Sequence, residues 1–534
     1  MLGLSFTVLQ IIFFKKKLLL NLRVNFQIFL IQISDTYIIM REFKNHTNFL
    51  PKVAEKINES QVIAVDLDGT LTLTDTLHES VLTLVRNKPY FLFLLPLWLF
   101  QGIAYLKLKV AENSELDVIT LPYNQPLIDW LKEERLRGKK IVLCTAASEQ
   151  IAKAIVKHFH FFDDFIASNS AINLKSSAKR DALKERYGDK GYVYAGNSND
   201  DLEVWASASD AVVVNASDKV LAKALKLTSV AKVFRSDKAG IAVWLKAIRV
   251  HQWLKNLLLF VPLLAAHQIG NAHSLGLLVI AFLSFSLCAS SVYLVNDLLD
   301  LESDRSHPRK RFRPFATAKL PILYGVVAAP VLIAASFLLG TVVSTDFLIV
   351  LLVYLALTVT YSFGLKRLVL VDCLALATLY TVRIIAGAAA VSVSLSFWLL
   401  AFSIFIFLSL ALVKRYAELL VQSREGKNSA HGRGYLVADA PLLQALGVSS
   451  GYISTLVIAL YLRSENVMSL YIQPLVIWFL IPILLFWVSW IWLKSSRGEM
   501  HDDPVIFAAK DKTSLSVAAI IAFVLISATI GFEL

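Results

Sequence analysis

The chain has 534 residues, too many for one ordinary domain, so two or more domains are expected. It is 56% hydrophobic and only 18% charged, a balance that indicates a membrane protein. The net charge is +12, but the bases cluster beside apolar runs, which favours orientation in a bilayer over nucleic-acid binding. No nucleic-acid partner is therefore expected. The three cysteines are far apart and form no CxxC pair, which argues against a disulfide framework or a zinc site.

Residues 1–54 are an N-terminal extension of uncertain role. Within it, an apolar start (LGLSFTVLQIIFF) precedes the triplet KKK, whereas a signal peptide carries its positive charge first. Two interpretations stay open. Either Met40 is the true start and residues 1–39 have no function, or those residues form a segment on the membrane surface.

Residues 55–235 have the mixed composition of a soluble domain. Short β-rich runs (VIAVDLDGT, KKIVLCTAA, GYVYAGNS and DAVVVNAS) alternate with helical stretches such as SEQIAKAIVKHF and KRDALKERYG. Strands that alternate with helices predict an α/β fold with a doubly wound parallel sheet. An uncharged stretch at 89–106 lies between the first two strands and is interrupted by Pro96, Gln101 and Gly102. We expect it to be a membrane-touching part of a helical cap, inserted near 72–140, and not a membrane span.

Residues 236–534 are predicted to form an all-α polytopic membrane bundle of about nine transmembrane helices. Nine apolar segments recur, the first of them short: 254–270, 275–296, 320–340, 347–365, 368–391, 396–413, 441–462, 467–493 and 513–532. Alternate loops hold seventeen lysines and arginines on one side and only Arg463 on the other. By the positive-inside rule, the basic loops and the domain at 55–235 are predicted to face the cytoplasm. The chain is expected to be a multi-pass protein of the inner or plasma membrane.

An acidic stretch, YLVNDLLDLESDRSHPRKRFRP, begins at residue 293, where the second apolar segment ends. On a helix Asp297, Asp300 and Asp304 lie within about 60° of one another, with Asn296 beside them and Glu302 pointing away. Three carboxylates on one stripe repel each other unless a hard cation such as Mg²⁺ neutralises them. The alternative is a solvated helix end with a positive-inside flank.

Basic residues follow that stripe at once: Arg305, Arg309, Lys310, Arg311 and Arg313. We expect them to fix the loop inside the cell and to attract an anionic substrate.

Two ionisable residues lie inside one apolar segment. Asp372 and Arg383 are eleven positions apart, which returns a helix to within about 20° of its starting direction. They are therefore expected to face one cavity at separate depths, with Tyr380 about 80° away around the helix, and buried charges within a membrane usually serve function. The alternative is that each pairs with a neighbouring helix. Lys414 and Arg415 end another segment, where they either hold phosphates or only orient the chain.

The stretch NDLLDLESD has the form NDxxDxxxD and resembles the diphosphate-binding signature of the UbiA superfamily of intramembrane prenyltransferases. RVHQWLKNLLLFVPL, RKRFRP and YSFGLKRLVLVDCLALATLYTVR are similar to one branch, the decaprenyl-phosphate phosphoribosyltransferases. That branch joins phosphoribosyl diphosphate to a polyprenyl phosphate. Aromatic prenyltransferases of the superfamily carry a second DxxxD motif, but Leu376 stands four positions after Asp372. This departure favours the phosphoribosyl branch.

The resemblance implies a polyprenyl lipid substrate, a diphosphate-bearing donor and Mg²⁺. The implied metal ligands of the membrane part are Asp297, Asp300 and Asp304. The residues expected to bind substrate are Asn296, Arg311, Arg313, Lys366, Asp372, Tyr380, Arg383, Lys414 and Arg415. Two other functions stay open. One is prenyl transfer to an aromatic or other acceptor with a regulatory soluble domain, and the other is a transporter with a regulatory head.

In VIAVDLDGTLT, Asp66 and Asp68 emerge at the carboxyl end of a predicted strand, where α/β sites form. One carboxylate can attack phosphate while an acid two residues later protonates the leaving oxygen. DxDGT resembles the first motif of haloacid dehalogenase (HAD)-type phosphatases, and Thr145, Lys179 and GNSNDD follow in order.

That second resemblance implies Asp66 as nucleophile and Asp68 as general acid and base. Thr145 and Lys179 would hold the phosphoryl group. Mg²⁺ would bind Asp66, Asp68, Asp200 and Asp201. Asn197 stands where many members have Asp, so a catalytically weak or regulatory domain is the alternative.

Overall fold

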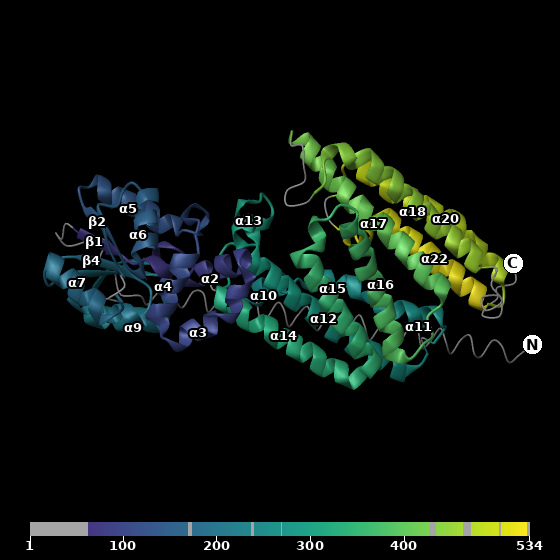
Figure 1. Ribbon diagram of the computed structural model, residues 1–534, viewed down its shortest axis with the longest axis horizontal. Helices are drawn as coiled ribbons and strands as arrows, with labels where there is room; N and C mark the ends of the chain where they lie inside the picture. The colour runs from purple at the N-terminus through teal and green to yellow at the C-terminus, as the bar shows by residue number, and fades with distance from the viewer. Residues whose placement is uncertain are drawn as a thin grey trace, which may run out of the picture.

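The computed structural model describes residues 62–168, 173–235, 240–268, 270–426, 434–462, 471–500 and 503–530. The predicted extension at 1–54 and Arg463 lie outside the described residues. An α/β part and a long helical part lie end to end (Figure 1).

The α/β part contains one six-stranded sheet whose strands all pair in parallel, in the order β3-β2-β1-β4-β5-β6. Its strands are β1 (Val62–Val65), β2 (Lys140–Ser148), β3 (Asp164–Ser168), β4 (Val193–Gly196), β5 (Asp210–Val214) and β6 (Ser229–Phe234). The helices that follow them are α5 (Gln125–Leu136), α6 (Glu149–His158), α7 (Ser177–Tyr187), α8 (Leu202–Ser207) and α9 (Asp218–Leu227). The predicted parallel α/β sheet is thus confirmed. Strands β3 and β6 are additions to the four predicted runs.

The central strand β1 explains the continuous apolar run VIAV, since all four residues are buried. Ile63 and Val65 belong to one hydrophobic core, and Val62 and Ala64 to the core on the opposite face. The chain runs outward from β1 through β2 to β3 and then returns to β4 on the other side of β1. This reversal creates a switch point at the carboxyl ends of β1 and β4, the usual ligand-binding position in such folds.

The segment between β1 and α5 forms a cap of short helices. It contains η1 (Leu67–Leu71), α2 (Thr76–Asn87), η2 (Pro89–Phe93), α3 (Leu95–Phe100), α4 (Ile103–Asn113) and η3 (Val118–Thr120). Pro96 lies in the first turn of α3, and Gly102 precedes α4 with a positive φ of 109°. These breaks divide the uncharged stretch at 89–106, so no helix in it is long enough to span a bilayer.

The helical part contains eight helical segments long and apolar enough to cross a membrane, among the described residues. They are α12 (Ala272–Leu299), α14 (Ile322–Val343), α15 (Thr345–Phe363), α16 (Val371–Val391), α17 (Phe397–Arg424), η8 with α18 (Val437–Tyr461), η9 with α20 (Pro474–Ser496) and α22 (Lys512–Ile530). The first predicted segment is instead the shorter run Val250–Ala265, made of η5 (Val250–Phe260) and α11 (Val261–Ala265). The prediction of about nine spans therefore becomes eight, because this run lacks the required length.

Short elements join these helices. They are α10 (Ile241–Ala247), α13 (Leu301–Ser306), η6 (Lys310–Phe312), η7 (Leu365–Arg367) and α21 (Pro504–Ala508). Asp300 separates α12 from α13 with φ −98° and ψ 12°. The three motif aspartates therefore do not lie on one continuous helix, and the predicted single stripe is bent at Asp300.

Helix α2 of the cap docks against the end of the bundle that carries the acidic motif. The guanidinium of Arg305 donates to both carboxylate oxygens of Glu79 at 2.6 and 3.1 Å, and both side chains are buried. Arg86 and Glu302 form a second pair at 3.0 Å that is largely exposed. The two parts of the chain are thus joined by ion pairs immediately beside Asp304.

Candidate active sites

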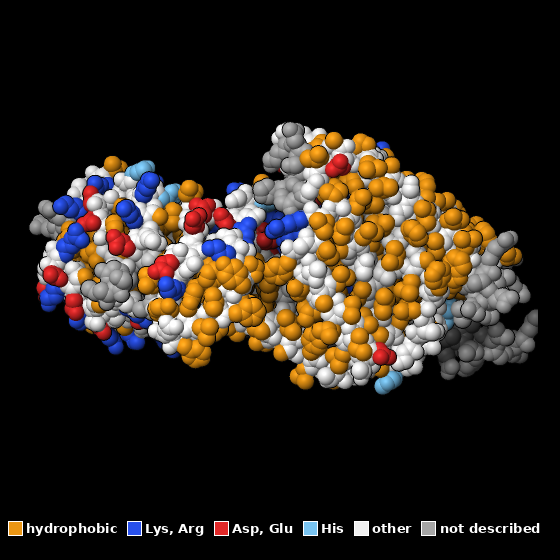
Figure 2. Space-filling view, in the orientation of Figure 1, with side chains coloured by type: hydrophobic (Ala, Val, Ile, Leu, Met, Phe, Trp, Pro, Cys, Tyr) orange, Lys and Arg blue, Asp and Glu red, His pale blue; other side chains and the backbone are white. Residues whose placement is uncertain are grey.

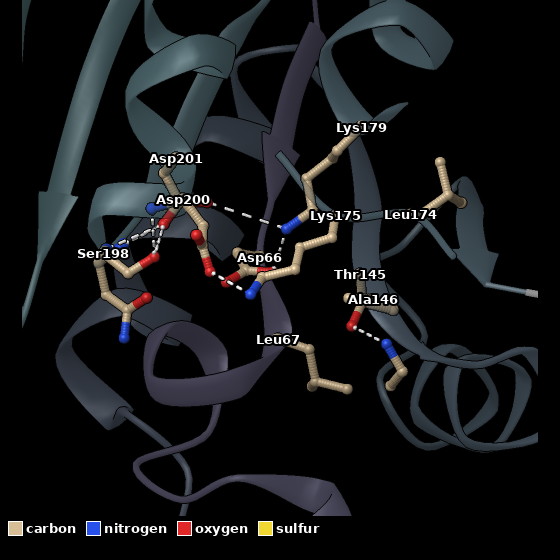
Figure 3. A network of polar contacts seen from close by, with 12 residues as sticks. Asp66, Leu67, Thr145, Ala146, Leu174, Lys175, Lys179, Ser198, Asp200 and Asp201 are labelled. Carbon is tan, nitrogen blue, oxygen red and sulfur yellow. Dashed lines mark hydrogen bonds and ion pairs between the residues drawn. The ribbon is translucent and has the colours of Figure 1, made fainter. Parts of the chain in front are cut away.

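The first candidate site lies at the switch point of the sheet (Figure 3). Asp66 follows β1, and Lys179 extends from α7 to donate to its Oδ1 at 2.7 Å. Lys179 also donates to the Tyr194 hydroxyl at 2.9 Å and lies 3.8 Å from Asp201. The Tyr194 hydroxyl donates to Asp201 at 2.9 Å. These four buried side chains form one polar group, here called the sheet-edge site.

Asp201 is held rigidly by the turn after β4. Its Oδ2 accepts the backbone N–H groups of Asn197 and Ser198, each at 2.9 Å, and the Ser198 hydroxyl at 3.1 Å. Gly69 allows the neighbouring loops to approach, because a Cβ there would lie 2.1 Å from the Asn197 amide nitrogen. The sequence GNSNDD therefore orients one acid toward Asp66, whereas Asp200 is exposed and pairs with Lys175 at 3.1 Å.

The two DxD carboxyls have different environments. Burial raises the pKa of Asp66 to about 6, although the adjacent Lys179 charge acts to lower it. Burial, followed by the charge of Asp75, raises the pKa of Asp68 to about 7, and Asp68 accepts the N–H of Thr76 at 2.7 Å. Both carboxyls therefore have pKa values closer to neutral pH than a free aspartate has. Such a pair can supply a nucleophile and a proton donor.

Other predicted and unpredicted residues complete this site. Thr145 is fully buried at the end of β2, and its hydroxyl accepts the N–H of Ala147 at 2.9 Å. Tyr194 was not predicted, since its only sequence signal is its place in a strand. Lys107 of α4 was also missed. It donates to the Ala146 carbonyl at 3.1 Å and so brings a cation of the cap beside Thr145.

The donor set of the sheet-edge site suits a hard cation. Among the described residues, no three His, Cys, Asp or Glu side chains are grouped closely enough to hold a metal ion. Lys179 lies between Asp66 and Asp201 and pairs with both. The carboxyl groups of these two residues and of Asp68 are oxygen donors of the kind that Mg²⁺ prefers. The residues present therefore fit Mg²⁺ with few protein ligands.

The second candidate site begins at the acidic motif. Asp297 pairs with Arg249 and with Arg313, the latter at 3.0 Å. Arg313 also donates to Asp304 at 2.5 Å. These four residues, here called the motif cluster, surround two buried carboxylates with two cations. Asp304 Oδ1 is buried and has no protein hydrogen-bond partner in the described part of the chain.

That unsatisfied oxygen is informative because a buried carboxylate oxygen without a partner is costly. Burial raises the pKa of Asp304, and the charge of Arg313 acts against that rise. A divalent cation would supply the missing partner, so the motif cluster fits a hard metal ion. Asp300 is only partly buried at the break between α12 and α13.

A second group of side chains, here called the core cluster, consists of Asp503, Lys255, Lys414 and Tyr380. Asp503 accepts from Lys255 at 2.8 Å, from Lys414 at 3.3 Å and from the Tyr380 hydroxyl at 3.0 Å. The charges of Lys255 and Lys414 hold the pKa of Asp503 well below its usual value, although burial acts to raise it. Two cations around one carboxylate give this cluster an excess positive charge. Arg249 immediately precedes η5, which carries Lys255, so one short segment connects the motif cluster to the core cluster.

Asp372 and Arg383, predicted to face one cavity at separate depths, have different partners in the structure. Asp372 is fully buried and binds Arg415 and the Tyr435 hydroxyl. Arg383 donates to Asn256 at 2.9 Å and to the Tyr354 hydroxyl at 3.1 Å. Each therefore pairs with neighbouring helices, which was the alternative interpretation. Spacing along one helix sets the direction in which each side chain points, but residues of neighbouring elements decide what that side chain contacts.

The remaining predicted residues lie around these clusters. Asn296 donates to the Ser362 hydroxyl at 3.0 Å, which links α12 to α15. Lys366 is partly buried in η7, and Arg311 is exposed with its guanidinium 4.9 Å from the Phe312 ring centre. Arg249, Lys255 and Asp503 were missed. RVHQWLKN, which carries the resemblance, contains the first two, whereas Asp503 has only the acidic pair in HDDP as a signal.

Comparison with known proteins identifies the family of the helical part. Residues 257–530 match the UbiA prenyltransferase family. An uncharacterized protein of Sinorhizobium fredii is 37% identical over 86% of this chain and 89% of its own length. A decaprenyl-phosphate phosphoribosyltransferase of Mycobacterium tuberculosis is 40% identical over 35% of this chain and 63% of its own length. A solved UbiA homologue from Archaeoglobus fulgidus, bound to GPP and Mg²⁺, covers 53% of this chain and 98% of its own at 14% identity and a TM-score of 0.41. The chain, a multi-pass helical membrane protein with an added parallel α/β domain, belongs to the UbiA prenyltransferase family.

Proposed function

We propose that the helical part at 236–534 transfers a phosphoribosyl group from phosphoribosyl diphosphate to a polyprenyl phosphate, with Mg²⁺. The domain at 55–235 then acts as a HAD-like phosphatase and removes the 5-phosphate of the product. The observation that carries the proposal is the continuity of the motif and core clusters along residues 249–255. The motif cluster, at one end of this segment, supplies carboxylates for a metal ion, and the core cluster, at the other end, supplies surplus cations for phosphate. Similarity to proteins named decaprenyl-phosphate phosphoribosyltransferase supports the choice of donor and acceptor.

In the transfer step, the motif cluster binds the diphosphate of the donor. Mg²⁺ bound by Asp297, Asp300 and Asp304 would neutralise charge on the departing diphosphate. Arg249 and Arg313 pair with these carboxylates and lie beside them, so they are placed to bind the phosphates. The bond from the anomeric carbon to diphosphate breaks, and a lipid phosphate oxygen forms the new bond to that carbon.

The core cluster orients the phosphate of the acceptor lipid. Lys255 and Lys414 supply two donors, and Asp503 fixes both ammonium groups and the Tyr380 hydroxyl. Such fixed cations stabilise charge without reorganisation at the moment of reaction. No proton needs to be removed from the lipid phosphate, because it is already ionised.

In the second step, Asp66 attacks the phosphorus of the 5-phosphate while Asp68 protonates the departing 5-oxygen. Lys179 and Thr145 hold the phosphoryl oxygens, and Mg²⁺ held by Asp66 and Asp201 would offset their charge. Water then hydrolyses the aspartyl phosphate, with Asp68 accepting its proton. Burial raises the pKa of both acids toward neutral pH, where a carboxyl can exchange a proton with the reacting groups.

Prenyl transfer to an aromatic acceptor is the second candidate function, because the motif cluster would serve a prenyl diphosphate equally well. Against it, Asp372 is occupied by Arg415 and Tyr435 and has no second acid four positions later. A transporter with a regulatory head is the third, and it predicts no Mg²⁺-dependent release of diphosphate.

The test supplies purified full-length protein in nanodiscs with Mg²⁺, phosphoribosyl diphosphate and polyprenyl phosphate, and identifies lipids by mass spectrometry. The parent protein should form polyprenyl-phosphate ribose, and Asp66→Asn should accumulate its 5-phosphorylated form. Asp304→Asn should abolish both. Identical products from the parent and Asp66→Asn would contradict the coupled phosphatase. Turnover with a prenyl diphosphate and an aromatic acceptor instead would establish the second candidate.

A further inference from the structure

The cap exposes an apolar surface that the soluble part of a protein would ordinarily bury. Seven side chains of η2, α3, α4 and the turns between them are 53–88% exposed and make up the surface here called the cap face. They are Tyr90, Leu92, Phe93, Leu97, Leu99, Phe100 and Ile103. Scattered exposed leucines need no explanation, but a contiguous group of this size marks an interaction site.

The charges around the cap face suit a lipid surface. No Asp or Glu occurs between Glu79 and Glu112, whereas Arg86, Lys88 and Lys109 flank the apolar residues. Lys88 lies 5.8 Å from the Phe91 ring centre, so its stem covers apolar surface while its ammonium remains available to solvent or headgroups. Bases and aromatic rings beside an apolar face, without acids, are typical of segments that lie in the interface of a membrane with anionic lipids.

The cap face continues into the apolar surface of the membrane bundle. Ile241 and Leu245 of α10 are 80% and 46% exposed, and Leu323 and Tyr324 at the start of α14 are 50% and 54% exposed. Trp244 stacks on Tyr324 with ring centres 6.2 Å apart, which attaches α10 to α14. Figure 2 shows orange side chains extending without a charged break from the lower edge of the cap to the bundle. The buried pair of Arg305 and Glu79 holds α2, and hence the cap, in this position.

We propose that the cap face lies in the cytoplasmic leaflet, parallel to the membrane plane, so that its partner is the lipid surface. The short helices α3 and α4 enter the headgroup region without crossing the bilayer. Lys107 lies on α4 with this surface and reaches the Ala146 carbonyl beside Thr145. Helix α4 therefore joins the cap face to the strand that carries Thr145, which places the phosphatase residues near the leaflet. Its substrate class is a phosphomonoester attached to a membrane lipid, a consequence that rests on the proposed phosphatase function.

A depth measurement tests the surface itself and requires no activity. An environment-sensitive fluorophore is attached to Phe100→Cys in the full-length protein, reconstituted in nanodiscs that contain phosphatidylglycerol and spin-labelled lipids. The matched control is Leu136→Cys, since Phe100 and Leu136 are 88% and 89% exposed. Leu136 ends α5, on the other side of the sheet from α3 in Figure 1. Lipid spin labels should quench the fluorophore at position 100 and leave that at position 136 unchanged. Equal, water-like signals at both positions would overturn the proposal.

An activity measurement tests the substrate class. The pair Leu97→Asp and Phe100→Asp, neither of which is part of the sheet-edge site, should reduce dephosphorylation of a lipid-linked phosphate by roughly tenfold or more. Hydrolysis of soluble p-nitrophenyl phosphate should be unchanged. Equal loss with both substrates would refute the assignment of substrate class. Quenching at position 100 without any phosphatase activity would leave the membrane surface standing and refute the proposed phosphatase.

Discussion

The buried ion pair between Glu79 and Arg305 should control how firmly the α/β domain docks onto the membrane bundle. We consider the substitution Glu79→Gln, which keeps the shape of the side chain and one acceptor oxygen but removes its charge. The Arg305 guanidinium would retain its bond to the Ala316 carbonyl at 3.1 Å and lose its counter-charge. The two side chains are 5% and 9% exposed, so water replaces the lost partner poorly.

The magnitude follows from that burial. Removing one partner from a buried pair costs about 3–5 kcal/mol, and the retained amide oxygen places Glu79→Gln near the lower limit. About 3 kcal/mol corresponds to a change of roughly hundredfold in the docking equilibrium constant. Arg86→Gln is the matched control, because its pair with Glu302 has side chains 36% and 46% exposed. An exposed pair contributes less than about 1 kcal/mol, or at most roughly fivefold.

Hydrogen exchange followed by mass spectrometry in nanodiscs measures the docking equilibrium. Peptides that cover α2 and α13 should exchange roughly a hundred times faster in Glu79→Gln than in the parent. Peptides from the sheet should exchange at the parent rate, which separates undocking from unfolding of the domain. Equal exchange in Glu79→Gln and Arg86→Gln would refute the reasoning that burial makes the first pair decisive.

Three other predictions concern the two sites and the bundle. Gly387→Ala should lower the melting temperature in thermal denaturation, at a cost of about 1–3 kcal/mol, because a Cβ there would lie 2.0 Å from the Leu259 carbonyl oxygen. Asp503→Asn should reduce diphosphate release by roughly tenfold or more, since it leaves two lysines without their counter-charge, whereas Asp511→Asn, outside the core cluster, should not. Burial and a neighbouring carboxylate raise the pKa of Asp68 to about 7, so the folded chain binds this proton more tightly than the unfolded chain does. The protonated side chain therefore contributes stability that is fully present below about pH 4 and is lost as pH rises toward 7. In EDTA, Asp68→Asn should therefore melt higher than the parent at about pH 8 and equally at about pH 4; equal melting at both would contradict the shift.

Local sequence patterns were sufficient for the fold class. The run VIAV, buried on both faces, and the alternation of strands with helices predicted the parallel sheet, because such patterns depend only on neighbouring residues. Apolar length likewise predicted the membrane helices, although the first run was too short to cross. Strand β3 was missed because its residues are mostly only partly buried.

Local spacing also predicted the candidate acids of both sites, but it could not predict their partners. In the α/β domain, DxDGT and GNSNDD lie at the ends of adjacent strands, so the meeting of Asp66 with Asp201 follows from the sheet order. In the bundle, the break at Asp300 altered the predicted stripe, and the partners of Asp372 and Arg383 match the alternative interpretation. Each of these two residues is instead satisfied by a neighbouring helix.

The sequence by itself determined a membrane protein with an α/β head and two sets of candidate acids, since composition, hydrophobic period and motif spacing are local properties. The orientation inferred from its basic loops stays a prediction. Only the tertiary structure decided which cations meet those acids. Arg249 reaches Asp297 across 48 positions, and Lys255 reaches Asp503 across 248. Contacts at such separations leave no local pattern, because they depend on how helices pack and on where each buried charge finds a partner. The same packing placed Glu79 against Arg305 and so set the α/β domain beside the acidic motif.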